Sequence, residues 1–176
     1  MEMIYDSAAS PLGVLLAAAS EKGLTFAGLW EDEAYLLADL RGRYPGITLH
    51  SDAAAMKTVM DKLLLYLHGQ PQALDLAVDP IGSPFQQRVW SALQKVRYGQ
   101  TLTYGGLAAS MGLDLKAVRA VAHGCATNPV SLVIPCHRIL RSDGSLGGYY
   151  WGLARKRALL EMEGAIPATL RQAQLF

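Results

Sequence analysis

The sequence predicts an α/β (α+β) protein in two parts: an N-terminal antiparallel sheet with helices, then a mostly helical part that contains a helix-turn-helix. Three observations predict this class. Short apolar runs separated by turn residues fill roughly the first 30 residues. Helix caps and helically spaced apolar residues prevail after Ser83. The formal net charge changes sign, from −6 over residues 1–80 to +7 over residues 81–176.

Three short strands are expected at the N-terminus. Met3–Tyr5 and Val14–Ala18 flank the turn Ser10-Pro11-Leu12-Gly13. Leu24–Trp30 follows a second turn, Glu21-Lys22-Gly23, as the third strand. Strands at this spacing predict an antiparallel meander.

Three helices are expected next. Glu31–Arg43 begins with acidic residues, which suit the positive end of a helix dipole. Asp52 can cap a second helix, Ala53–His68. The stretch Ser83-Pro84-Phe85-Gln86 is a capping box with proline at the first helical position, and it opens a third helix that Gly99 closes.

The boundary between the two parts is expected between the second and third helices. Leu74–Val78 is predicted to form a further short strand, and Asp79-Pro80-Ile81-Gly82 follows it where the charge changes sign. We therefore expect one domain over residues 1–79 and another over residues 80–165. Residues 166–176 form a tail without a clear assignment.

A helix-turn-helix is predicted in the second part. Thr103 can cap a short helix, Tyr104–Met111, and Asp114 can cap a longer one from Leu115 to about Cys125. Many helical proteins contain such a pair, so the pattern alone does not establish DNA binding.

The second helix of this pair carries small residues around one arginine. Tight packing against another helix would explain the small residues, but an arginine is rarely buried without a partner. Arg119 therefore favours a nucleic-acid groove over a protein core. The small residues are Ala117, Ala120, Ala122 and Gly124.

A cysteine beside a histidine follows this helix. Asn128-Pro129 is a turn signal, and Ser131–Ile134 is predicted to be a buried strand that leads into Cys136. Cys136 can be a thiolate nucleophile with His137 as its base, or a small apolar residue of the core. The two residues alone favour the core residue.

Composition excludes several classes. No apolar run approaches the roughly 20 residues of a membrane helix, and the N-terminus lacks the pattern of a signal peptide. Cys125 and Cys136 give no disulfide framework, and the cysteines and histidines show no metal-ligand spacing. We expect a cytoplasmic protein with no metal and no cofactor. The basic C-terminal half suggests a polyanionic partner, with chance segregation of charges as the alternative.

Four segments together resemble one family of DNA-repair proteins. They are Arg119-Ala120-Val121, Asn128-Pro129-Val130, Ile134-Pro135-Cys136-His137-Arg138 and the segment from Gly147 to Glu163-Gly164. They resemble the O6-alkylguanine-DNA alkyltransferases, also called methylated-DNA–protein-cysteine methyltransferases. The resemblance is close from Ile81 to Gly164 and extends in pattern to the N-terminal half.

The resemblance implies a ribonuclease-H-like N-terminal domain and a winged helix-turn-helix. It also implies irreversible transfer of the alkyl group of O6-alkylguanine, and of O4-alkylthymine, from double-stranded DNA to Cys136. The modified base would be flipped out of the duplex, since its reactive atom is not reachable inside the stack. Each molecule would react once. The family implies a monomer with no membrane association, and it leaves room for cooperative assembly on DNA.

The resemblance also implies residue roles around the thiol. His137 would draw the proton from Cys136 through a water, and Glu163 would orient His137. Asn128 would hold the turn between the helix and the nucleophile. Tyr104 would contact the flipped base or the adjacent phosphate, with a core tyrosine as its alternative.

The remaining implied residues concern DNA and the base. Arg119 would fill the vacated stack, and Ala120 lies beside it on the DNA-reading helix. Main-chain groups near Cys136, Ile139 and Tyr150 would bond the guanine edge, and Tyr149 would pack beside the base. The sequence departs from the family pattern at Tyr149-Tyr150-Trp151, where some relatives have small residues. We therefore expect the bulk of Trp151 to narrow the pocket against large alkyl groups.

Three other functions fit parts of the pattern. A lesion sensor of the same fold would lack the nucleophile, so Cys136 argues against it. A cysteine hydrolase usually brings its cysteine and histidine together from distant segments, unlike Cys136 and His137. A DNA-binding regulator is supported only by the helix-turn-helix and the charge distribution.

Overall fold

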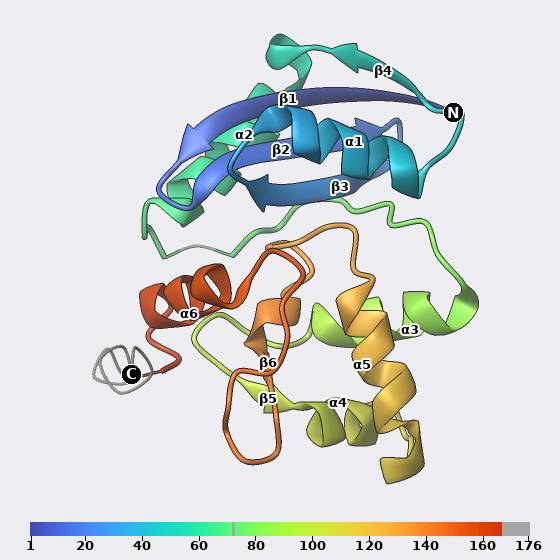
Figure 1. The fold of residues 1–176 in the computed structure, drawn as a ribbon, viewed down its shortest axis with the longest axis vertical. Coiled ribbons are helices and arrows are strands. Elements are labelled where there is room, and N and C mark those ends of the chain that lie inside the picture. The colour runs from blue at the N-terminus through green and yellow to red at the C-terminus, as the bar shows by residue number, and fades with distance from the viewer. Residues whose placement is uncertain (72, 167–176) are drawn as a thin grey trace.

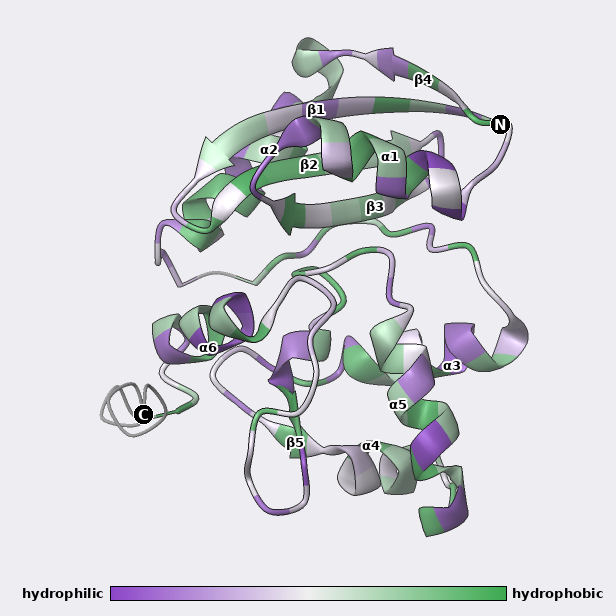
Figure 2. Cartoon of the chain, in the orientation of Figure 1, coloured by the Kyte–Doolittle hydropathy of each residue, from purple (hydrophilic) through white to green (hydrophobic). Residues whose placement is uncertain are grey.

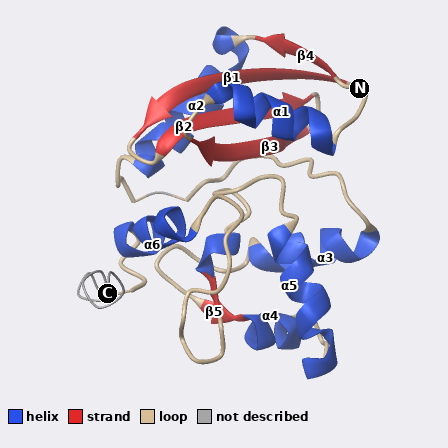
Figure 3. Ribbon diagram, viewed as in Figure 1, coloured by secondary structure: helices blue, strands red, loops and turns tan. Residues whose placement is uncertain are grey.

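The computed structural model describes residues 1–71 and 73–166. A sheet with its helices forms one layer, and a helical layer lies against it (Figure 1). Loops occupy most of the space between the two layers (Figure 3). Apart from Ile166, the predicted tail lies outside the described residues.

The sheet contains the predicted meander and one strand that the sequence did not indicate. β1 (Glu2–Ser10), β2 (Gly13–Ser20) and β3 (Gly23–Trp30) pair antiparallel, which confirms the meander. β4 (Thr48–Ser51) adds to the free edge of β1 in parallel, so the strand order is β3-β2-β1-β4. β4 was missed because it is short and mostly exposed, with no alternating apolar pattern.

Helices cover both faces of this sheet. α2 (Ala53–Leu67) begins at a cap on Asp52, as predicted. α1 (Glu33–Arg43) begins two residues later than predicted, because Asp32 caps it and does not form part of it. Consecutive residues of β2 point to opposite faces, and its central residues, 15–18, are all buried because one face packs on α1 and the other on α2. The continuous apolar colour of β2 reflects this double burial (Figure 2).

The outer edge of β3 is bonded by two irregular segments. Leu24 N donates to Ala77 O at 2.9 Å, and Ala27 N donates to Pro129 O at 2.9 Å. The strand predicted at Leu74–Val78 is therefore wrong, because this segment meets β3 only at an isolated bridge. The hydrogen bond to Pro129 links the segment that leads to Cys136 to the edge of the sheet.

The helical layer keeps most of the predicted caps. α3 is Pro84–Leu93 and has the expected capping box. It ends before Gly99 because i→i+3 turns replace its hydrogen bonds after Leu93. The helix-turn-helix consists of α4 (Tyr104–Ser110), a 3₁₀ turn (Leu115–Ala117) and α5 (Val118–Ala126).

A small parallel pair and a last helix complete the layer. β5 (Leu102–Thr103) pairs with β6 (Ile139–Leu140), which directly follows the Cys136–Arg138 turn. α6 (Leu153–Met162) then packs behind that turn, and Glu163 is its C-cap.

The strand predicted at Ser131–Ile134 is also wrong. These residues form a turn, in which Ile134 N donates to Val130 O at 3.0 Å and Leu132 has φ +74°. They are buried, as the apolar run indicated. In a short apolar run, periodicity cannot distinguish a buried strand from a buried turn.

Among the described residues, none of the helices combines the length and the apolar character needed to span a lipid bilayer.

Candidate active site

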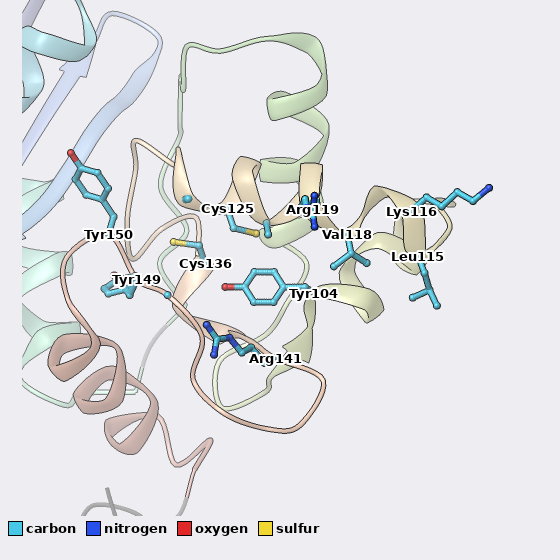
Figure 4. Close-up of a pocket in the computed structure, with 13 residues that line it drawn as sticks. Tyr104, Leu115, Lys116, Val118, Arg119, Cys125, Cys136, Arg141, Tyr149 and Tyr150 are labelled. Atoms are coloured by element: carbon cyan, nitrogen blue, oxygen red, sulfur yellow. The ribbon is translucent and has the colours of Figure 1, made fainter. Parts of the chain in front are cut away.

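Cys136 lies at the inner wall of a pocket in the helical layer. Pro135 precedes it, and Cys136, His137 and Arg138 form a 3₁₀ turn. The cavity has a volume of about 820 Å³ and is bounded by α4, α5 and the loop of residues 141–152. The Cys136 sulfur is directed into this cavity, although the residue is only 8 % exposed (Figure 4).

Asn128 holds the turn and the thiol together. Its Nδ2 donates to Ile134 O at 2.7 Å and to Cys136 Sγ at 3.2 Å. Its Oδ1 accepts from Val130 N at 2.9 Å. The side chain thus links the end of α5 to both sides of the irregular segment, and it bonds the sulfur directly.

His137 and Glu163 form a buried pair behind the thiol. His137 Nε2 lies 2.9 Å from Glu163 Oε1, and both side chains are fully buried. Arg138 donates to Oε2 at 2.9 Å and to Oε1 at 2.8 Å in a bidentate contact. Gly99 N completes the set at 3.3 Å from Oε2. These bonds keep the carboxylate charged, since they outweigh the effect of burial and leave the Glu163 pKa well below its usual range.

Tyr66 joins this pair from the opposite layer, and sequence reasoning missed it. Its hydroxyl donates to Glu163 Oε1 and lies 3.2 Å from His137 Nε2. Tyr66 comes from the last turn of α2 and has 0 % exposure. Tyr66 lies within the helix predicted over Ala53–His68, and nothing in that segment of the sequence indicated this contact.

Burial is the largest influence on the pKa values of Cys136 and His137. Burial raises the pKa of the Cys136 thiol, against smaller opposing effects of Asn128 and Lys156. Burial also lowers the His137 pKa, against the opposing hydrogen bond and charge of Glu163. The thiol is therefore protonated and the imidazole neutral at neutral pH. Alkylation of the sulfur then requires a proton acceptor, and a neutral imidazole can supply one.

Lys156 is a second residue that sequence reasoning missed. Its Nζ donates to Ile139 O at 2.6 Å and to Gly148 O at 3.1 Å. The side chain is buried, which lowers its pKa to about 8. Lys156 stands between Arg155 and Arg157 in the sequence, and this basic run gave no indication that one of its members is buried.

Several predicted residues line the pocket together. Tyr104 extends from α4 across from Cys136, and Arg119 borders the opening from α5 (Figure 4). Burial raises the Tyr104 pKa to about 12, so its hydroxyl keeps its proton. The Tyr149 ring lies between the cavity and His137, with ring centroids 6.5 Å apart. Cys125 also lines the pocket.

Other predicted residues lie elsewhere or are otherwise engaged. Ala120 is exposed on α5 and does not line the pocket. Gly124 packs against Val89 of α3, so this part of the small-residue face belongs to the core. The Ile139 carbonyl is already bonded to Lys156. Tyr150 lines the pocket, but its hydroxyl donates to Asp39 Oδ1 of α1 at 2.5 Å.

The expectation for Trp151 is wrong. This residue is 1 % exposed and packs between Phe26 and Trp30, on the α1 face of the sheet. Its indole Nε1 donates to Ser131 Oγ at 2.8 Å. The large apolar side chain belongs to the core because the sheet offers it a partner that a local sequence pattern does not reveal. Separately, no group of three or more metal-ligating side chains occurs among the described residues.

The fold and the site define a class: helix-turn-helix proteins in which the second helix borders a pocket that a buried cysteine lines. Residues 3–80 match the ribonuclease-like domain of 6-O-methylguanine DNA methyltransferase, and residues 84–165 match the DNA binding domain of the same family. The chain belongs to the 6-O-methylguanine DNA methyltransferase family.

Individual relatives agree with this assignment. A methylated-DNA–protein-cysteine methyltransferase of Methanosarcina barkeri is 37% identical over 161 residues, which are 92% of this chain and 97% of that protein. The bifunctional transcriptional activator/DNA repair enzyme Ada of Escherichia coli is 38% identical over 90% of this chain. The chain spans 45% of the length of Ada.

Solved structures share the whole fold. The crystal structure of Mycobacterium tuberculosis O6-methylguanine methyltransferase matches with a TM-score of 0.77 and 34% identity, over 98% of this chain and 99% of that one. A structure of the Mycobacterium tuberculosis protein in complex with DNA matches with a TM-score of 0.76 and 33% identity, over 97% and 98% of the two chains.

Proposed function

We propose that this protein repairs O6-alkylguanine in double-stranded DNA by transferring the alkyl group to its own Cys136. One observation carries the proposal: the Cys136 sulfur faces a pocket beside α5, and a neutral imidazole with a buried carboxylate lies behind it. The family of the chain and the DNA complex of a relative support it.

The reaction is a displacement at carbon. The sulfur of Cys136 attacks the alkyl carbon, an S–C bond forms, and the C–O6 bond breaks with its electrons going to the guanine. The thiol proton passes to His137, through a water in our proposal, and Glu163 stabilises the imidazolium that results. A proton then returns to the guanine. The thioether does not revert, so each molecule reacts once.

The unpartnered nitrogen of His137 fits this role. Nε2 is engaged by Glu163, whereas Nδ1 is buried and has no hydrogen-bond partner among the described residues. A neutral imidazole that donates from Nε2 carries its lone pair on Nδ1. Nδ1 is therefore the atom that would accept the proton.

DNA would approach the face that carries α5. Arg119 is exposed at the mouth of the pocket and would fill the space left by the flipped base, with Ala120 beside it against the groove. Tyr104 would donate its hydroxyl proton to the base or the neighbouring phosphate. Tyr149 would pack on the base.

Finer points of the proposal follow from the same pocket. Main-chain groups of Tyr150, and of Ile139 after rearrangement at Lys156, would bond the guanine edge, and O4-alkylthymine would bind in the same way. We propose that the protein acts as a monomer that can assemble cooperatively on DNA. Both cysteines are free, and a required thiol favours a reducing compartment such as the cytoplasm.

Mass spectrometry tests the proposal directly. The protein is mixed with an equimolar duplex that contains O6-methylguanine, and the peptides that carry Cys136 and Cys125 are weighed. We expect one methyl group on Cys136, no methyl group on Cys125, and no transfer in Cys136→Ala. Cys125→Ala is the matched control, since it removes the other pocket thiol and should retain transfer. An unmodified wild-type protein would refute the function.

A further inference from the structure

One hydroxyl group connects the N-terminal sheet layer to the His137–Glu163 pair. Tyr66 ends α2, and its ring is fully buried against the C-terminal layer, where it meets Tyr98 edge-on with centroids 6.1 Å apart. Its hydroxyl donates to Glu163 Oε1 and lies 3.2 Å from His137 Nε2. Of the described residues before Ile81, no other makes a hydrogen bond or an ion pair with His137 or Glu163.

The protons available on Tyr66, His137 and Glu163 determine which of these groups donates each hydrogen bond. A carboxylate only accepts, so the single phenolic proton of Tyr66 goes to Glu163. The phenolic oxygen is then free to accept from His137 Nε2, which shares its proton between this oxygen and Glu163. Both acceptors favour a proton on Nε2, and this leaves the lone pair on Nδ1.

The hydroxyl also weakens the pull of Glu163 on the imidazole. A carboxylate oxygen that accepts an additional hydrogen bond has less charge to offer its other partners. Without the Tyr66 hydroxyl, Glu163 would stabilise the imidazolium more strongly, and more His137 would be protonated in the resting protein. A protonated imidazole cannot accept the thiol proton.

We propose that Tyr66 is a positioning residue for alkyl transfer, through which the N-terminal layer holds His137 as a neutral base with its lone pair on Nδ1. The inference rests on the proposed function, since it assumes that His137 accepts the thiol proton. It gives the N-terminal layer a role in the chemistry in addition to its role in the fold.

Several charged or titratable groups surround His137 and influence the pH at which it takes up a proton. Glu163 and Arg138 contact one another beside it, and Lys156 of α6 opposes its protonation. The Tyr149 ring packs edge-on against the imidazole, and Cys136 is its neighbour in the chain. Replacement of Tyr66 by phenylalanine leaves all of these groups in place and keeps the packed ring.

The experiment compares Tyr66→Phe with wild type and with Tyr44→Phe in the full chain. Tyr44 is a matched control, because its buried hydroxyl donates to Thr25 O at 3.2 Å within the N-terminal layer, away from His137. Single-turnover transfer from an O6-methylguanine duplex is measured between about pH 5.5 and pH 9. In parallel, nitrogen NMR of ¹⁵N-histidine-labelled protein without DNA follows His137, which is assigned by its persistence when His50, His68 and His123 are replaced.

We expect Tyr66→Phe to slow transfer by up to roughly threefold at neutral pH and by up to roughly tenfold on the acid limb, both less than the roughly 10²–10⁴-fold contribution of a general base itself. The acid limb of its rate profile should move to higher pH by roughly half to one unit, as should the NMR titration of His137. A higher pH should restore most of the rate. Duplex affinity should not change, and Tyr44→Phe should behave as wild type.

The outcomes separate two failures. If wild-type protein does not transfer the methyl group, the proposed function fails, and the NMR titration still reports whether Tyr66 controls His137. If wild type transfers but Tyr66→Phe has an unshifted rate profile and an unshifted His137 titration, the role of Tyr66 is refuted. A rate loss that is equal at every pH also refutes it, because that pattern indicates a merely structural contribution.

Discussion

The ammonium group of Lys156 bonds the carbonyl oxygen of Ile139 at 2.6 Å. The same Nζ reaches Gly148 O at 3.1 Å. Ile139 lies in β6, and Gly148 lies in the loop that closes the pocket. One buried cation thus joins the strand after Cys136 to the loop in front of it, and the position of the loop depends on this link.

Lys156→Met should therefore impair transfer. The methionine keeps most of the apolar stem but leaves two carbonyl oxygens without their donor, at roughly 1–3 kcal/mol for each unpaired buried group. We expect single-turnover transfer to fall by about 10- to 100-fold, since about 1.4 kcal/mol corresponds to a factor of ten. Lys95→Met, at an exposed lysine of the same layer, is the control. A variant that transfers at the wild-type rate would show that the loop is held by other contacts.

Asn128→Ala should destabilise the folded protein and also slow alkyl transfer. The substitution removes three hydrogen bonds, to Val130 N, Ile134 O and Cys136 Sγ. Two buried main-chain groups lose their partner, so we expect the free energy of unfolding to fall by about 2–4 kcal/mol. Urea denaturation measures this change, with Gln100→Ala at an exposed position as the control. A loss below about 0.5 kcal/mol, the usual range of surface substitutions, would contradict the assigned bonds.

Glu163 should make stability depend on pH in the acid range. Its pKa in the folded protein is depressed, because the hydrogen bonds from His137, Arg138 and Tyr66 outweigh the effect of burial. In the unfolded chain the carboxyl takes up a proton as the pH falls through about 4.5, while the folded protein keeps it ionised. The contribution of Glu163 to the free energy of unfolding is thus present above about pH 4.5 and is lost progressively below it.

Glu163→Gln should remove this part of the pH dependence. We expect a lower free energy of unfolding at neutral pH, by about 3–5 kcal/mol, because Arg138 loses its buried partner. Below about pH 4.5 the difference from wild type should shrink. Denaturation in urea between about pH 3 and pH 7 measures both proteins, with Glu21→Gln as an exposed control. Parallel curves for wild type and Glu163→Gln would contradict the depressed pKa.

Local signals in the sequence predicted the parts of the fold that depend on local chemistry. The caps at Asp52, Ser83 and Thr103 are hydrogen bonds between residues two or three apart, so the sequence displays them fully. The resemblance placed Cys136, His137 and Glu163 in one site, and the structure brings these residues together.

Contacts between the layers could not be predicted in this way. Tyr66 and Glu163 are 97 positions apart. The resemblance marked Glu163, but nothing in the segment of Tyr66 indicated that its hydroxyl reaches this carboxylate. Trp151 looked like a pocket residue because its packing partners lie in β3, far away in sequence. In each case the tertiary arrangement decides the role, and a single sequence carries no direct record of that arrangement.

Tyr150, and not Trp151, is the bulky residue at the side of the pocket. Its ring separates the pocket from a hollow of about 460 Å³ that Asp39 and Arg43 also line. The hydroxyl donates to Asp39 Oδ1 at 2.5 Å, and the Arg43 guanidinium lies 4.6 Å from the ring centroid. Arg43 in turn pairs with Asp39 at 2.7 Å. These contacts with α1 hold Tyr150, which is 47 % exposed, between the two spaces.

Tyr150→Ala should therefore favour large alkyl groups by joining the two spaces. We expect the ratio of transfer rates for O6-benzylguanine to O6-methylguanine to rise about tenfold, as for a contact of about 1.4 kcal/mol. Asp39→Asn, which weakens the hold on Tyr150 but keeps the ring, should give a smaller rise in the same direction. Tyr35→Phe, at an exposed tyrosine of α1 that stacks on Trp30, should leave the ratio unchanged. An equal ratio in wild type and Tyr150→Ala would mean that the pocket discriminates alkyl size elsewhere, at Tyr104 or Tyr149.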